Sequence, residues 1–336
     1  MRSVLHAVHA VFIAALIGAA SLIALPVAAQ DKASVRLKWV AQSQFAGVYV
    51  AKAKGYYSAE GIDMTINPGG PNLNAESLVA SGADTFAVGG GTESSLAARD
   101  KKLPIATIAM LHQRTPYVYV VLPDSKIEKI GDFKGKKITT FFTGAQHTLY
   151  AIMRRNGMAS TDASITAQGV SMTPFINKEV DIATVTLYNE LNVLKARGVN
   201  VRIFAPDDFG VSMPRDTLIT SDKVVAENPK LVQGFLNATL RGWKYAIQNQ
   251  PEAVDIVMAA APGLERPHQV AMLAEAARLM VADAGTTQGL GAIDMARMKA
   301  AHDLLLDAKV ISAPVEMGVA FTPRFWEAVP AADKKM

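Results

Sequence analysis

Residues 35–66 read VRLKWVAQSQFAGVYVAKAKGYYSAEGIDMTI, and this stretch decides the fold. Apolar side chains alternate at Val35, Leu37 and Trp39, which is typical of a strand. From Gly47 the pattern is that of a helix with glycine at its end, and DMTI then starts a second strand. A strand that leads through a helix into another strand predicts an α/β unit, because parallel strands need a crossover connection.

The same alternation continues along the chain. AESLVASG and TESSLAARDKK are predicted helices, and DTFAVGGG and LPIATIAML are predicted strands, which together predict a mostly parallel sheet. The pattern changes at Thr115–Pro116, where the β-prone run YVYVVLPDS begins, and a second alternating unit follows. Another β-prone run, RDTLITSD, follows Met213–Pro214, and the rest of the chain is predicted to be almost entirely helical.

Two strand-like crossings predict an α/β fold with two lobes. The predicted boundaries are residues 30–115 for the first part of lobe 1, 116–213 for lobe 2 and 214–336 for a mostly helical return to lobe 1. Such a layout places a ligand cleft between the lobes, with strand ends from both lobes facing it.

The first 29 residues have the pattern of a secretory signal. Arg2 precedes an apolar run from Ala10 to Leu25, and Val27 and Ala29 fit the small positions before a cleavage site. A membrane anchor is the alternative, but the run is shorter than the roughly 20 residues that a spanning helix needs. We therefore expect export to the periplasm, with cleavage near Ala29.

Composition restricts the class of protein further. The chain has no cysteine, so no thiol could carry a lipid anchor and stability must come from a core rather than from disulfides. The net charge of +4, of which Arg2 carries one, is dispersed, and no basic tract favours nucleic acid. We expect a monomer that is free in solution.

Motifs for catalysis or metal binding are missing. The histidines are isolated and lack metal-ligand spacing, and GDFKGKK at 131–137 lacks the glycine spacing and the hydroxyl residue of a phosphate loop. GGG at 89–91 is not a dinucleotide fingerprint, and no G-x-S-x-G elbow occurs. These observations favour a protein that is not an enzyme, with no catalytic residues, no metal and no cofactor.

The chain resembles periplasmic solute-binding proteins of ABC importers. It is most similar to the branch that binds the pyrimidine precursor of thiamine, with riboflavin-binding and sulfonate- or nitrate-binding relatives. The resemblance covers nearly all of the chain after the signal and rests on five stretches, at residues 37–66, 81–105, 123–138, 188–198 and 208–219. It implies a type II-like fold, a small-molecule ligand and an inner-membrane ABC permease as partner. Synthase relatives carry a cysteine-rich motif that is absent here, which favours binding over synthesis.

The opening stretch then has a chemical interpretation. Trp39, Phe45 and Tyr49 could hold an aromatic heterocycle by ring contacts, and Gln42 and Gln44 offer donors and acceptors to its edge. The alternative is that the aromatic residues belong to the core.

Further loops are expected at the cleft. In AVGGGTES the backbone N–H groups could bind an acceptor, although strand–helix packing would also explain the glycines. FFTGAQH supplies a possible lid, Glu190 could accept hydrogen bonds from a ring, and a solvated helix start is the alternative for Glu190. The candidates from these loops and the hinge are Gly90, Gly91, Thr92, Phe142, Thr143, Gly144, Tyr188, Asn189, Glu190 and Asp208.

Two rival functions stay open. An oxyanion ligand such as a sulfonate or nitrate would call for arginine or lysine in the cleft loops, and the loops just described contain neither. A pyrimidine-synthase-like enzyme is the other rival. The preferred expectation is a binding protein that captures a small planar heterocycle and delivers it to a permease.

Overall fold

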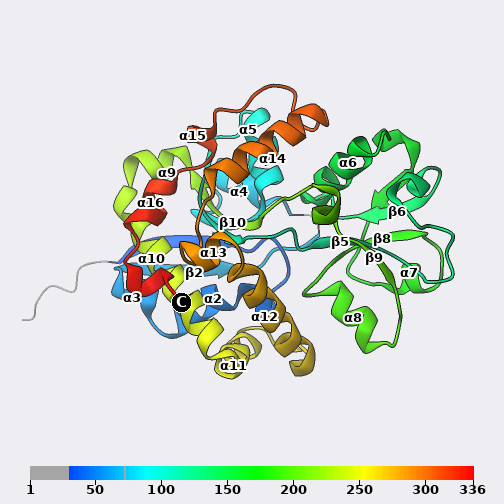
Figure 1. Cartoon of the computed structure of the whole chain (residues 1–336). Coiled ribbons are helices and arrows are strands. Elements are labelled where there is room, and N and C mark those ends of the chain that lie inside the picture. The colour runs from blue at the N-terminus through cyan, green and yellow to red at the C-terminus, as the bar shows by residue number, and fades with distance from the viewer. Residues whose placement is uncertain (1–29, 72) are drawn as a thin grey trace, which may run out of the picture. The chain divides into compact units, whose positions relative to one another are not determined.

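A computed structural model describes residues 30–71 and 73–336, and the predicted signal segment lies outside this range. The unit from Asp31 to Met336 contains two five-stranded sheets with helices around them (Figure 1). The α/β architecture with two sheets is therefore as predicted. No helix within the described ranges has both the length and the apolar character that crossing a membrane requires.

The first sheet has the order β2-β1-β3-β10-β4. Its strands are β1 (Asp31–Arg36), β2 (Ile62–Asn67), β3 (Phe86–Gly91), β4 (Ile105–His112) and β10 (Arg215–Ser221). Strand β1 is parallel to both β2 and β3, but β10 lies antiparallel between β3 and β4. The sheet is consequently mixed, because a strand that returns from the second half of the chain is inserted in the reverse direction.

The second sheet has the order β7-β6-β8-β5-β9. Its strands are β5 (Tyr117–Val121), β6 (Lys137–Thr140), β7 (Ser164–Ala167), β8 (Ile182–Thr186) and β9 (Arg202–Phe204). Strand β6 is parallel to β7 and β8, whereas β5 is antiparallel to β8 and β9. Helices α6 (Ala145–Arg155), α7 (Thr173–Ile176) and α8 (Glu190–Ala196) connect these strands.

Two chain segments join the sheets, between β4 and β5 and between β9 and β10. They are tied to each other, because the Met213 N–H donates to Thr115 Oγ1 at 2.7 Å and the Thr115 hydroxyl donates to Asp207 Oδ1 at 3.1 Å. Movement of one sheet relative to the other would have to bend both segments together. The lobe boundaries at 115/116 and 213/214 stay a proposal.

Glycines let two helices approach closely at the core of the first sheet. Helix α2 (Ala46–Ala53) packs on α10 (Pro229–Gln248). A Cβ at Gly47 would lie 2.2 Å from Trp243 Cγ, and a Cβ at Gly242 would lie 2.2 Å from the Gly47 carbonyl oxygen. The rings of Phe86 and Phe235 stack beside this contact at 3.9 Å between centroids.

The remaining helices complete the fold around the first sheet. Helix α2 is followed by α3 after the turn at Gly55, where φ is +71°. The other helices are α3 (Tyr56–Ala59), α4 (Ala75–Ala80), α5 (Thr92–Asp100), α9 (Asp222–Glu227), α11 (Gln250–Ala260), α12 (Arg266–Met280), α13 (Ala284–Thr287), α14 (Met295–Asp307), α15 (Met317–Ala320), α16 (Pro323–Ala328) and α17 (Ala331–Lys334). The predicted helical character of the last third is confirmed.

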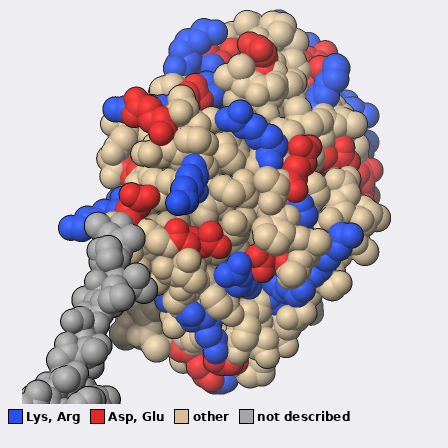
Figure 2. Space-filling view, turned by 90° about the vertical axis from the view of Figure 1, so that its left-hand side faces the viewer, with Lys and Arg blue, Asp and Glu red and all other residues tan. Residues whose placement is uncertain are grey.

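Charged side chains of both signs are interspersed on the face drawn in Figure 2. Blue and red groups lie next to each other there, separated by uncharged surface, and neither sign forms a continuous patch on that face. This arrangement fits the dispersed charge of the sequence.

Candidate functional site

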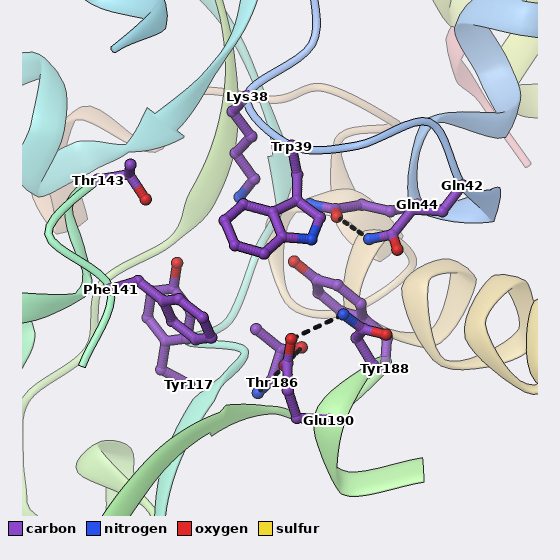
Figure 3. A pocket seen from close by; sticks show the side chains of 11 residues that line it. Lys38, Trp39, Gln42, Gln44, Tyr117, Phe141, Thr143, Thr186, Tyr188 and Glu190 are labelled. Atoms are coloured by element: carbon purple, nitrogen blue, oxygen red, sulfur yellow. Dashed lines mark hydrogen bonds between the residues drawn. The ribbon is translucent and has the colours of Figure 1, made fainter. Parts of the chain in front are cut away.

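A pocket of about 30 Å³ lies where loops from both sheets meet. Lys38, Trp39, Gln42 and Gln44 follow β1, Phe141 and Thr143 follow β6, and the segment after β8 supplies the opposite wall (Figure 3). Carboxyl ends of parallel strands are where α/β sheets bind ligands. The lining residues are Lys38, Trp39, Gln42, Gln44, Tyr117, Phe141, Thr143, Thr186, Tyr188, Asn189 and Glu190. We call this pocket the ring slot.

Aromatic side chains form much of the wall of the ring slot. The Trp39 and Phe141 rings meet edge to face, with centroids 5.5 Å apart, and Phe141 lies 6.1 Å from Tyr117 in a stacked arrangement. Tyr188 closes another side, and its ring lies 5.4 Å from that of His112. Rings from both sheets therefore face one space (Figure 3), which suits contact with a flat apolar face.

Two glutamines form a polar edge of the slot. Gln42 Nε2 donates to Gln44 Oε1 at 2.8 Å, and Gln44 Nε2 donates to Asp216 Oδ2 at 2.7 Å. This chain orients both amides, because Asp216 as a carboxylate can only accept. Gln42 Oε1 has no hydrogen bond within the described part of the chain and remains available as an acceptor.

Glu190 forms a second polar edge and is only 4% exposed. Its Oε2 accepts from the Thr186 N–H at 2.9 Å and from the Thr186 hydroxyl at 2.6 Å, and its Oε1 accepts from Asn189 Nδ2 at 2.7 Å. A carboxylate has about four acceptor positions, so Oε1 keeps one for a ligand. The alternative of a solvated helix start is wrong for Glu190, because the side chain is buried.

A hydrogen bond joins the two sides of the slot beside Glu190. Asn189 Oδ1 lies 2.9 Å from His268 Nε2, on α12 of the first-sheet side. Since the Asn189 amide nitrogen donates to Glu190, its oxygen accepts and His268 donates. Helix α12 also binds the glutamine loop, because the Ser43 N–H donates to Gln269 Oε1 at 2.7 Å. One helix thus supports both walls.

A buried charge pair lies next to the glutamines. The Lys38 ammonium is paired with Asp216, whose Oδ1 is also 3.6 Å from His112 Nδ1. Burial lowers the pKa of Lys38 and that of His112. Burial alone would raise the pKa of Asp216, but Lys38 and His112 outweigh this effect and hold it below its ordinary value. Asp216 is therefore the buried partner of Lys38.

The slot brings together about half of the candidate residues. Those that line it are Trp39, Gln42, Gln44, Thr143, Tyr188, Asn189 and Glu190. Phe45 and Tyr49 do not line it. Phe45 is completely buried and Tyr49 is nearly so, and both belong to the core cluster that also contains Trp39. Ligand contact by these two residues stays a prediction.

The glycine-rich loop after β3 does not line the slot either. Gly90 N–H donates to Glu76 Oε1 at 2.7 Å, and Thr92 N–H donates to the Pro214 carbonyl at 3.0 Å. Gly91 has a φ of +148° and pairs with Arg215 across the sheet. The N–H groups of Gly90 and Thr92 are thus used within the protein, which favours strand–helix packing as the role of this loop. Ligand contact by the loop stays a prediction.

Three other candidates lie elsewhere. Phe142 is 48% exposed, and with Gly144 it lines a second cavity rather than the slot. Asp208 is exposed in the short 3-10 helix η4 (Pro206–Phe209) and does not line the slot, so the structure does not support ligand contact there.

Several lining residues were not among the candidates. Tyr117 starts β5 directly after a crossing, so its position in the chain could have indicated it. Phe141 belongs to the stretch FFTGAQH, in which the sequence predicts a lid from Phe141 and Phe142. Lys38 precedes the opening loop, and Thr186 ends β8. The cleft loops contain no arginine or lysine, as the sequence shows, but Lys38, which precedes the opening loop, lines the slot.

Comparison with known proteins indicates the class of this chain. The family described as NMT1/THI5 like matches residues 42–253. The riboflavin-binding protein RibY of Chloroflexus aurantiacus is 28% identical over 88% of this chain and 86% of its own length. A formylaminopyrimidine-binding protein of Halalkalibacterium halodurans is 27% identical over 68% of this chain and 71% of its own. The resemblance to this branch of solute-binding proteins is confirmed.

Enzymes also occur among the relatives. A 4-amino-5-hydroxymethyl-2-methylpyrimidine phosphate synthase of Legionella pneumophila is 25% identical over 71% of this chain and 76% of its own length. The matched relatives therefore include both binding proteins and synthases.

Solved structures of low sequence identity share the fold. The alkanesulfonate-binding protein SsuA of Xanthomonas axonopodis pv. citri, bound to MOPS, has a TM-score of 0.66 at 14% identity, over 88% of this chain and 99% of that one. A Candida albicans protein with the generic periplasmic binding protein fold has a TM-score of 0.60 at 12% identity, over 87% and 96%. The predicted fold class, a periplasmic-binding-protein fold, is confirmed.

Proposed function

The chain belongs to the NMT1/THI5-like family, and we propose that it is the substrate-binding component of an ABC import system that captures a small planar heterocycle. The ligand class is a flavin such as riboflavin or an aminopyrimidine related to the thiamine precursor. The ring slot is the proposed site, and relatives that bind riboflavin and formylaminopyrimidine support this ligand class.

The observation that carries the proposal is the composition of the slot. Trp39, Tyr117 and Phe141 offer ring faces and edges, while Gln42 and Glu190 offer unused acceptor positions at its margin. A planar heterocycle matches both features, because its faces are apolar and its ring N–H or amino groups are donors.

Charge supports a heterocycle over an oxyanion. Lys38 is the one lysine or arginine among the residues that line the slot, and Asp216 balances it. The buried Arg215 is paired with Glu93, and its Cζ lies 4.1 Å from the centroid of the Tyr117 ring. Arg215 does not line the slot. A sulfonate or nitrate in the slot would lie near the Glu190 carboxylate, and no unpaired cation among the described residues lines the slot to offset the repulsion. Burial of two negative charges together without a cation is unfavourable.

We propose binding rather than synthesis. The synthase relatives that this chain resembles carry a cysteine-rich motif, and this chain has no cysteine. No catalytic residue, metal or cofactor is proposed, and turnover assays with the purified protein and pyrimidine products would test this part.

Location and partners follow as proposals from the same class. Solved structures described as periplasmic sulfonate-binding proteins share the fold, and residues 1–29 have the signal pattern. We propose a periplasmic monomer, cleaved near Ala29, that delivers its ligand to an inner-membrane permease. Protein sequencing of the mature N-terminus would test cleavage, and an intact Met1 would contradict it.

A thermal-shift panel tests the ligand class. A compound that binds only the native state raises the melting temperature by mass action. We expect a rise with riboflavin or with an aminopyrimidine, and none with taurine or nitrate at the same concentrations. A rise with the oxyanions alone would overturn the proposal.

A further inference from the structure

A second cavity, of about 120 Å³, lies beside the ring slot. Thr143 lines both spaces, so they are neighbours across one short segment after β6. The second cavity is bounded by α4 and α5 on one side and by the start of α6 on the other. Its polar wall contains Glu76, Ser94, Lys101, Gln146 and His147. We call it the polar chamber.

Glu76 provides a buried acceptor in the chamber wall. The residue is only 3% exposed, and its Oε1 is occupied by the Gly90 N–H at 2.7 Å. No hydrogen bond joins the second carboxylate oxygen to a described residue, and this oxygen is not one of the fully enclosed polar atoms without a partner. A ligand that supplies an O–H could therefore donate to it.

His147 provides a donor, and its tautomer follows from its neighbours. The Gly144 N–H donates to Gln146 Oε1 at 2.8 Å, so the Gln146 amide nitrogen is the atom that lies 3.2 Å from His147 Nε2. That amide donates, and His147 Nε2 must accept. Burial lowers the pKa of His147 to about 4, so the ring is neutral at pH 7 and carries its proton on Nδ1.

Two buried polar atoms in the wall have no partner within the described residues. They are His147 Nδ1 and the Ser94 hydroxyl, which can both donate and accept. The chamber wall thus offers a ligand one acceptor (Glu76), one donor (His147 Nδ1) and one hydroxyl (Ser94). Alternating donors and acceptors of this kind match a chain of hydroxyl groups, each of which does both.

The buried Glu76 carboxylate disfavours an anionic tail. A phosphate would meet this carboxylate, and the attraction of the exposed Lys101 ammonium is screened by water and offsets the repulsion only in part. An ammonium tail could pair with Glu76, but it has no acceptor for the unpartnered His147 Nδ1 donor. A neutral hydroxylated chain can donate to Glu76 and accept from His147.

We propose that the polar chamber binds a neutral polyhydroxylated tail carried by the heterocycle in the ring slot. This inference rests on the proposed function, and it narrows the ligand class to a ring with such a tail. Riboflavin has this form, lumiflavin has the same ring with a methyl group in place of the tail, and riboflavin 5′-phosphate adds a charged phosphate.

Quenching of flavin fluorescence on titration with the full mature protein tests the proposal. We expect riboflavin to bind at least about tenfold more tightly than lumiflavin, from two or more added hydrogen bonds, and more tightly than riboflavin 5′-phosphate. Glu76→Gln keeps an oxygen for Gly90 and should weaken riboflavin about tenfold, leave lumiflavin unchanged and reduce the discrimination against the phosphate.

Controls separate this inference from the proposed function. Phe141→Leu in the ring slot should weaken both flavins alike, and Ser94→Ala should weaken riboflavin alone, so a folding defect in one variant does not decide the result. Equal affinity for riboflavin and lumiflavin, or an equal loss of both in Glu76→Gln, overturns the polar chamber and leaves the proposed function intact. If neither flavin nor the aminopyrimidine binds, the proposed function fails and this inference fails with it.

Discussion

Replacing Glu190 separates its structural role from its role in binding. Glu190→Ala removes the acceptor of three hydrogen bonds, two from Thr186 and one from Asn189. An unpaired buried donor costs about 1–3 kcal/mol. Because the Thr186 hydroxyl and the Asn189 amide can rotate, we expect the free energy of unfolding to fall by about 2–4 kcal/mol. At roughly 2 °C per kcal/mol for a large chain, the melting temperature should fall by about 4–8 °C.

Glu190→Gln is the more informative change. Its amide oxygen can still accept from both Thr186 groups, while its NH₂ faces the donor of Asn189. One lost hydrogen bond costs about 1 kcal/mol, so the melting temperature of the unliganded protein should fall by only about 2 °C. The free acceptor position on Oε1 is lost, however. Since hydrogen bonds to charged groups contribute about 1.5–3 kcal/mol, ligand affinity should fall by about 10- to 100-fold.

Scanning calorimetry of the unliganded variants and titration calorimetry with riboflavin measure the two quantities. Glu179→Gln, an exposed position in the same half of the chain, is the matched control and should change neither. If Glu190→Gln binds riboflavin as tightly as the unchanged protein, Glu190 does not contact the ligand, and its hydrogen bonds serve only to hold the start of α8.

Three further changes probe the fold and its charges. Gly47→Ala should lower the melting temperature by several degrees, because the new Cβ would lie 2.2 Å from Trp243 Cγ; an unchanged melting curve would contradict the close α2–α10 contact. Asp216→Asn should cost about 3–5 kcal/mol in urea unfolding, because Lys38 and His112 lose their buried partner; a loss below about 1 kcal/mol would refute that partnership. Burial lowers the pKa of His147 from 6.5 to about 4, so the unfolded chain takes up a proton before the folded one does, and stability should fall as the pH drops from about 6.5 to about 4; His147→Gln should flatten this dependence, and an equally steep decline in the variant would show that other groups cause it.

Local patterns were sufficient for most of the fold. Alternation at Val35, Leu37 and Trp39 predicted β1, and the change at Thr115–Pro116 marked the passage to the second sheet. The antiparallel insertion of β10 was not predictable in this way. Its partners are β3 and β4, more than a hundred residues earlier, and the residues of β10 alternate as any strand does.

The site was predictable where one loop supplies several of its residues. Trp39, Gln42 and Gln44 follow β1 in a place where turn residues are usual, and all three line the slot. Phe45 shares their chemistry, but the 3-10 helix η1 (Ser43–Phe45) turns this residue into the core. The local sequence cannot tell whether an aromatic side chain in this loop points into the slot or into the core.

Residues whose roles depend on distant partners were missed or misassigned. Lys38 pairs with Asp216, which is 178 residues away along the chain. The residues next to Lys38 in the sequence therefore could not indicate that its charge is balanced. Gly90 lies in a stretch whose glycines resemble an anion-binding loop, yet its N–H group donates to Glu76 in helix α4. In both cases tertiary pairing decides whether a polar group is free to meet a ligand.

Mass spectrometry of the small molecule that remains bound to the natively purified protein tests the central claim most directly. The ring slot predicts a planar heterocycle that absorbs in the ultraviolet, and the polar chamber predicts that this heterocycle carries a neutral hydroxylated tail. A sulfonate or another oxyanion recovered in stoichiometric amount would contradict the account.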